Sequence, residues 1–138
     1  MREIFGEKEI DITEIETYIK EFNQYWGEEA IQKEIFMLDI HIGWKKTIYE
    51  RARRESKVIN PIRITFTKKE NNYIKVKLKI DNGGLVLWYE TETDRGRLDI
   101  DYEEVKKVIA FRYETSEGFW FTYQNNTYIS FRVCSLKQ

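Results

Sequence analysis

The feature that most constrains the fold of this chain is a strict alternation of apolar and polar residues in its middle third. A period of two places successive side chains on opposite faces of an extended strand, so that one face is buried and the other meets water. The alternation predicts two strands, at 62–67 and 74–80, joined by a turn at 68–72. Their outward residues include four basic side chains: Arg63 in the first strand, and Lys75, Lys77 and Lys79 in the second.

Turn signals divide the remainder of the chain into further short strands. Asp81-Asn-Gly-Gly84 is a strong hairpin signal, because Asn and Gly tolerate the positive φ angles of a two-residue turn. Between residues 101 and 107 either a helical turn or a bulged corner fits. We expect strands at 85–92, 98–100, 108–113, 119–124 and 127–133. Together they predict an antiparallel β-meander of about six to seven strands, and partial closure of this meander into a barrel stays open.

Helices are predicted at the N-terminal end. Asp11-Ile-Thr-Glu14 has the spacing of a capping box, and apolar residues then recur on one helical face, which predicts a helix over 12–26 that ends at Gly27. A repeat of every four residues from Trp44 predicts a second helix over 44–57. The segment between the two predicted helices, residues 28–42, fits both the period of 3.6 residues of a helix and the period of two of a strand. We interpret 34–42 as a strand, and a helical start at residue 28 remains an alternative.

These elements predict an α+β fold in which N-terminal helices pack on the meander. A length of 138 residues suits one domain, spanning residues 1–138. The single cysteine, Cys134, has no second thiol with which to form a disulfide, and no apolar run is long enough to cross a membrane. We therefore expect a cytoplasmic protein with no membrane association. The sequence predicts no oligomeric state.

Charge is sharply segregated along the chain, although the net charge is only −1. Residues 1–34 carry four basic and ten acidic side chains, residues 45–80 carry twelve and three, and residues 81–138 carry seven and ten. If the second helix packs beside the lysine-bearing strands, a basic patch results that suits an acidic protein or phosphates. Alternatively, the acidic first helix covers it, or it only keeps the sheet soluble. The candidate binding residues are Lys45, Lys46, Arg51, Arg53, Arg54, Arg63, Lys75, Lys77 and Lys79.

Other candidate sites have weaker signals. Phe119, Phe121 and Tyr123 share one face of a strand, and core packing explains them better than a platform for stacking bases. His41 is the only histidine, and no metal site or catalytic group is assigned to it. Asp99 and Asp101 share a strand face, where paired carboxylates could hold a divalent cation, but surface solubility or intramolecular pairing explains them better.

Signatures of catalysis and of metal or cofactor binding are absent from the sequence, whereas aromatic residues and segregated charge are abundant. We therefore expect a non-enzymatic module that acts by docking on a protein partner, as small bacterial or phage immunity and inhibitor proteins do, with no cofactor. The first alternative is a nucleic-acid-binding protein that uses the basic segment 45–80. The second is a divalent-metal-dependent enzyme that uses the carboxylates near Asp99 and Asp101.

Overall fold

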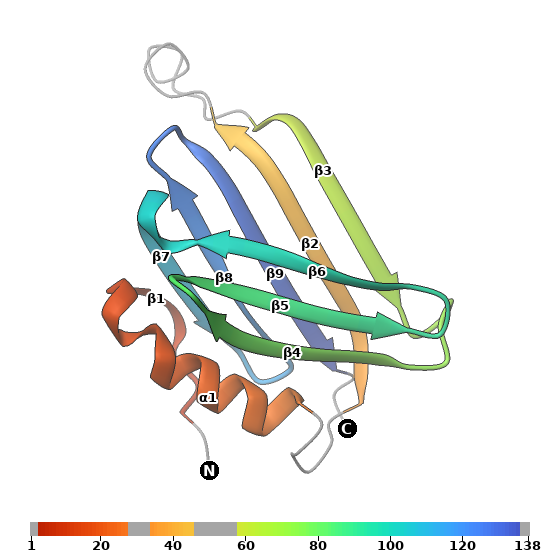
Figure 1. Cartoon of the computed structure of the whole chain (residues 1–138). Coiled ribbons are helices and arrows are strands. Elements are labelled where there is room, and N and C mark those ends of the chain that lie inside the picture. Colours follow the sequence, from red (N-terminus) through yellow and green to blue (C-terminus); the bar gives the residue numbers. More distant parts are fainter. Residues whose placement is uncertain (1–2, 28–33, 46–57, 136–138) are drawn as a thin grey trace.

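The described part of the chain forms mostly antiparallel β structure with one short α-helix (Figure 1). The computed structural model describes residues 3–27, 34–45 and 58–135. Its helix α1 covers Ile15–Trp26, and 3-10 turns cover Ile12–Glu14 and Tyr102–Glu104. The strands are β1 Gly6–Ile10, β2 Ile35–Lys45, β3 Val58–Thr67, β4 Ile74–Asp81, β5 Gly84–Thr91, β6 Arg95–Asp101, β7 Val105–Arg112, β8 Ser116–Tyr123 and β9 Thr127–Ser135.

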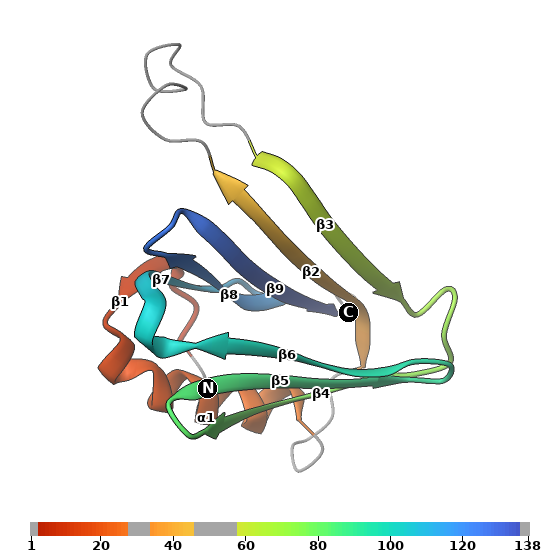
Figure 2. The same ribbon diagram turned by 45° about the horizontal axis from the view of Figure 1, so that its top comes forward.

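The nine strands of the described ranges form two separate sheets. Six strands make a larger sheet in the order β1-β7-β8-β9-β2-β3, and three make a smaller sheet in the order β4-β5-β6. Figure 2 shows the smaller sheet and α1 on the same side of the larger sheet. The ring of Phe66 on β3 lies 5.1 Å from that of Tyr89 on β5, which joins the two layers. The core therefore lies between the larger sheet and a second layer made of β4-β5-β6 and α1.

Helix α1 confirms the predicted N-terminal helix. The Asp11 carboxylate accepts from the Thr13 N–H, and the Glu14 carboxylate accepts from the Asp11 N–H, which completes the capping box. The predicted apolar face is buried, and its residues are Ile15, Ile19, Phe22 and Trp26. Phe22 contacts Phe119 and Phe131 of the larger sheet, with ring centroids 6.4 and 6.1 Å away.

The strands confirm most sequence predictions, but their arrangement differs. The strand predicted over 34–42 is present from Ile35 and continues through Lys45, so the predicted helix over 44–57 is wrong for its first two residues. The remainder of that helix, and the alternative helical start at residue 28, lie outside the described residues. Among those described, one α-helix is present rather than several.

The prediction of one continuous meander is also wrong. Strands β4-β5-β6 and β7-β8-β9 form two three-stranded meanders in different sheets, and β3 pairs with β2 rather than with β4. Closure into a barrel is not supported, because β1 and β3 end the larger sheet without pairing to each other. Alternation assigns each side chain to a face but does not specify the neighbouring strand, and this explains the error.

No helix in the described ranges combines the length and apolar character needed to cross a membrane.

Candidate functional site

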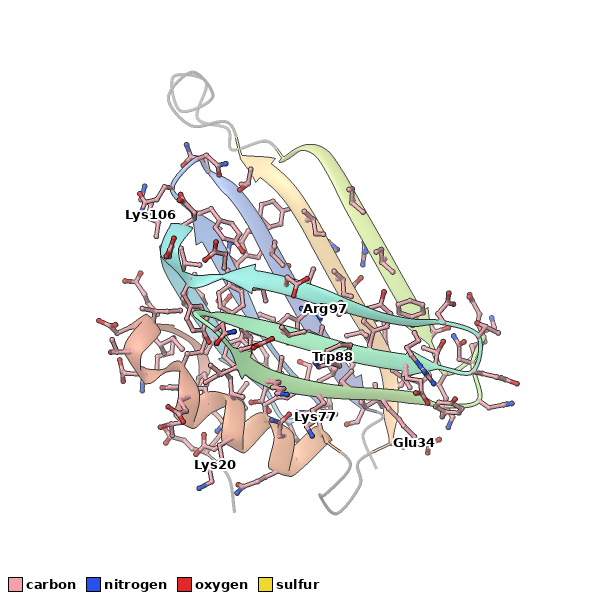
Figure 3. All side chains as sticks on the ribbon, viewed as in Figure 1. Lys20, Glu34, Lys77, Trp88, Arg97 and Lys106 are labelled. Carbon is pink, nitrogen blue, oxygen red and sulfur yellow. The ribbon has the colours of Figure 1, made fainter. Side chains whose placement is uncertain are left out.

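The solvent side of the smaller sheet brings together basic side chains from β4 and β6, with a tryptophan of β5 between them. The lysines of β4 alternate with buried residues, and all three lysine side chains are exposed. Antiparallel register places Lys77 opposite Trp88 of β5 and Trp88 opposite Arg97 of β6. Figure 3 labels these three residues on neighbouring strands. We call this surface the tryptophan face, and its residues are Lys75, Lys77, Lys79, Trp88, Glu90, Arg95, Arg97 and Asp99.

Trp88 stands at the centre of this face. Its side chain is 40% exposed, and the Arg97 guanidinium lies 4.9 Å from its ring centroid, a cation–π geometry. Asp99 orients that guanidinium, since the Arg97 Nε donates to the carboxylate at 3.1 Å. This hydrogen bond raises the pKa of Arg97, so the group stays charged. The sheet therefore presents an indole whose orientation is supported by a fixed cation.

The acidic residues of the face already have basic partners. Glu90 forms an ion pair with Arg95 at 3.2 Å and also accepts a hydrogen bond from the Tyr73 hydroxyl. Asp99 is held by Arg97. Within the described residues, neither Lys77 nor Lys79 has a carboxylate in ion-pair range. The positive charge of these two lysines is therefore not neutralised within the face.

A groove borders the face between β4 and α1. Its volume is about 630 Å³, within the range of small-ligand sites. The side-chain amide of Asn23 crosses it to bond both backbone groups of Leu78. Figure 3 labels Lys20 on the helix and Lys77 on the strand. The described lining residues are Glu16, Ile19, Lys20, Asn23, Gln24, Gly27, Lys77, Leu78, Lys79 and Ile80.

The predicted basic patch is only partly present. Lys75, Lys77 and Lys79 lie on the tryptophan face, but Arg63 lies on β3 in the other sheet, so the two strands are not neighbours. Lys45 ends β2, and its side chain lies outside the described part. Lys46, Arg51, Arg53 and Arg54 also lie outside the described residues.

Arg63 takes part in a polar cluster on the outer surface of the larger sheet. Its Nε and Nη2 donate to the Asp39 carboxylate at 3.2 and 3.0 Å, and the Thr65 hydroxyl donates at 2.8 Å. The Nε2 atom of His41 lies 3.6 Å from Asp39. Burial alone would raise the pKa of Asp39, but bonds from Arg63 and Thr65 outweigh it and lower this pKa.

The other sequence candidates occupy structural positions. Phe119 and Phe121 are buried, as predicted for core packing, and Trp120 stacks on Tyr128 on the opposite surface. Asp101 accepts from the Glu103 N–H and so caps the second 3-10 turn. No cluster of three or more His, Cys, Asp or Glu suited to a metal ion occurs in the described ranges.

Sequence reasoning missed Trp88, Arg95 and Arg97. The run Leu85-Val-Leu-Trp88 is apolar throughout, so alternation does not reveal that Trp88 points outward. A signal was nevertheless available in the turn. Asn82 and Gly83 have positive φ angles of 35° and 79°, and a two-residue turn at these positions fixes the register that places Trp88 beside Lys77.

No family model, curated protein or solved structure matches this chain. Its function is therefore inferred from its own residues.

Proposed function

We propose that this protein is a non-catalytic module that docks the tryptophan face onto an acidic surface of a protein partner. One observation carries the proposal: Trp88, 40% exposed, lies at the centre of a face whose unpaired charges are lysines. Exposed apolar groups that polar residues surround are typical of interaction sites. Tryptophan and arginine are also the residues that most often dominate binding energy in protein interfaces.

The orientation of the indole supports this role. Because Arg97 lies against the Trp88 ring and is itself held by Asp99, the indole loses less conformational freedom when a partner covers it. Arg97 is 46% exposed, so it can contact the partner as well. The pair therefore offers a rigid anchor at the centre of the face.

The lysines indicate the charge of the partner. Lys75, Lys77 and Lys79 occupy alternate positions of one strand, so their side chains share one face of the sheet and span roughly 13 Å along it. Such a row raises the association rate with an acidic surface and disfavours basic ones. Small bacterial or phage immunity and inhibitor proteins act by docking alone, and we propose the same mode of action here, in the cytoplasm and with no cofactor.

Comparative affinity capture from the native cell tests the proposal. Wild-type protein, Trp88→Ala, Lys77→Glu and the control Lys106→Glu serve as bait, and captured proteins are quantified by mass spectrometry. Lys106 is an exposed lysine of β7, far from Trp88 in Figure 3. We expect a set of proteins with acidic surfaces that wild type and Lys106→Glu retain and the two face variants lose. Identical sets from all four baits would contradict the proposal.

A second candidate is single-stranded nucleic acid, since Trp88 lies between two cations and such binders combine aromatic and basic side chains. Against it, Arg97 already covers part of the indole, and Glu90 and Asp99 add negative charge to the face. Fluorescence anisotropy with a labelled oligothymidine separates the candidates. Binding that weakens steeply with added salt and is lost in Trp88→Ala would favour nucleic acid over a protein partner.

A further inference from the structure

We infer that the groove between α1 and β4 receives an extended acidic segment of the partner protein, an inference that rests on the proposed docking function. The groove adjoins the tryptophan face directly, because Lys77 and Lys79 belong to both surfaces. A partner that covers Trp88 therefore also reaches the groove.

The charge of the lining selects an acidic occupant. Three cations, Lys20, Lys77 and Lys79, line the groove, and Glu16 is the only carboxylate among the described lining residues. The lysines of β4 are exposed, and Lys20 lies on the outward side of α1. Acidic side chains that lie along the groove would therefore meet lysines from both the strand and the helix.

The apolar residues of the lining suit a segment that also carries apolar side chains. Ile80 is 40% exposed, although it alternates with the lysines and so belongs to the side of β4 that is otherwise buried. Ile19 and Leu78 are buried beside it. A partner side chain packed on Ile80 would remove this apolar surface from water, at about 25 cal/mol per Å².

The backbone of β4 favours an extended segment. Asn23 bonds the N–H and C=O of Leu78, so these groups point toward α1 and away from β5. Backbone direction repeats every second residue in a strand, so the N–H and C=O of Ile80 also point to the groove side. Chains that add to a sheet edge use such groups as their main-chain partners. Asn23 therefore fills one pairing position of the edge and leaves the next for a partner.

The test uses a fluorescein-labelled hexapeptide of alternating Glu and Leu, with the matching Lys and Leu peptide as control. Anisotropy gives the affinity, and two-dimensional NMR of the labelled protein locates the site. We expect the acidic peptide to bind and to shift the amide signals of Lys20, Lys79 and Ile80. Ile80→Glu should weaken binding by at least about fivefold, the scale on which one charge repulsion and a lost apolar contact act. The control Lys106→Glu should change it by less than about twofold.

The outcomes separate this inference from the proposed function. No binding, preference for the basic peptide, shifts confined to other surfaces, or unchanged affinity in Ile80→Glu would overturn the groove assignment. If the groove assignment is overturned while Trp88→Ala still loses the captured proteins, the docking function of the face stands alone. If Trp88→Ala captures the wild-type set while the peptide still binds at Ile80, the proposed function fails and the groove site stands.

Discussion

The side-chain amide of Asn23 makes two hydrogen bonds with the backbone of Leu78, donating to its carbonyl oxygen at 2.8 Å and accepting from its N–H at 2.9 Å. It thus substitutes for one peptide unit of a neighbouring strand. Helix α1 is thereby joined to the edge of the smaller sheet, and the groove acquires its shape.

Asn23→Ala should destabilise the protein. Removal of the amide leaves both backbone groups of Leu78 without their partner in a partly buried place, which costs about 1–3 kcal/mol. Asn23→Asp should cost more than Asn23→Ala, because a carboxylate accepts from the N–H but repels the carbonyl oxygen. Urea denaturation measures both effects. Gln24→Ala, at an exposed neighbouring position, is the control and should cost less than about 0.5 kcal/mol; an equal loss in Gln24→Ala would refute the role of the Asn23 bonds.

A buried ion pair beside the C-terminal half of α1 should also make a large contribution to stability. Arg112 and Glu117 are each 2% exposed and lie 3.1 Å apart, and Trp26 donates to the same carboxylate. Arg112→Met leaves Glu117 without its buried cation and should cost about 3–5 kcal/mol. Arg112→Met combined with Glu117→Leu should cost less than the sum of the two single changes.

Glu21→Gln is the matched control for this pair. Its carboxylate also binds Arg112 but is 45% exposed, so its loss should cost less than about 1 kcal/mol. Thermal or urea unfolding of the four variants completes the cycle. If the stability costs of Arg112→Met and Glu117→Leu add up to the cost of the double variant, Arg112 and Glu117 do not act as a pair.

The pH dependence of stability should contain a contribution from Asp39. Its bonds with Arg63 and Thr65 hold the pKa of this carboxyl below its ordinary value, despite its burial. A lowered pKa stabilises the fold above about pH 4, the unfolded value, and this contribution is lost as the pH falls through the folded pKa. Asp39→Asn should therefore be less stable than wild type at pH 7, by about 1 kcal/mol because Arg63 is exposed.

Urea denaturation of wild type and Asp39→Asn between pH 2.5 and 7 checks this. The difference in unfolding free energy should be constant near neutrality and shrink toward acid. A difference that is independent of pH, or that grows as the pH falls, would contradict the assigned ionisation.

Local signals predicted the parts of the fold that depend on neighbouring residues. The capping box at Asp11 and Glu14 and the turn at Asn82 and Gly83 both formed where the sequence placed them, because a few adjacent residues determine each. The lysines of β4 were likewise expected to face water from alternation alone. For the candidate site, alternation was therefore enough to identify the three exposed lysines of β4, Lys75, Lys77 and Lys79.

Relationships between distant segments could not be predicted in this way. Strand β2 pairs with β9, which follows it by about ninety residues. The alternation of apolar and polar residues in each strand sets which face is buried, but it does not specify which strand lies beside it. Likewise, the Asn23 side chain hydrogen-bonds the backbone of Leu78, which lies 55 residues later in the sequence. The division of the strands into two sheets, the loss of Arg63 from the predicted patch and the formation of the groove all follow from such long-range pairing.

Trp88 and Arg97 should be coupled but should contribute little to stability. Both side chains are largely exposed, so Trp88→Ala and Arg97→Ala should each cost less than about 1 kcal/mol, with a coupling of about 0.5 kcal/mol in the double variant. Urea denaturation measures this cycle. Near-wild-type stability would show that loss of capture in Trp88→Ala reflects a lost contact surface, whereas a cost above about 3 kcal/mol would mean that Trp88 belongs to the core.

Gly43 should be required by the ring that covers it. Tyr128 lies across Gly43 and stacks on Trp120, with ring centroids 4.3 Å apart and planes 8° from parallel. A methyl group at position 43 would come within 2.7 Å of the Tyr128 ring, so Gly43→Ala forces the ring to move and should cost about 1–3 kcal/mol. In a Tyr128→Ser background the same change should cost less than about 0.5 kcal/mol, because the obstruction is gone. An equal cost in both backgrounds, measured by urea denaturation, would assign the effect to the backbone of β2 and not to the Tyr128 ring.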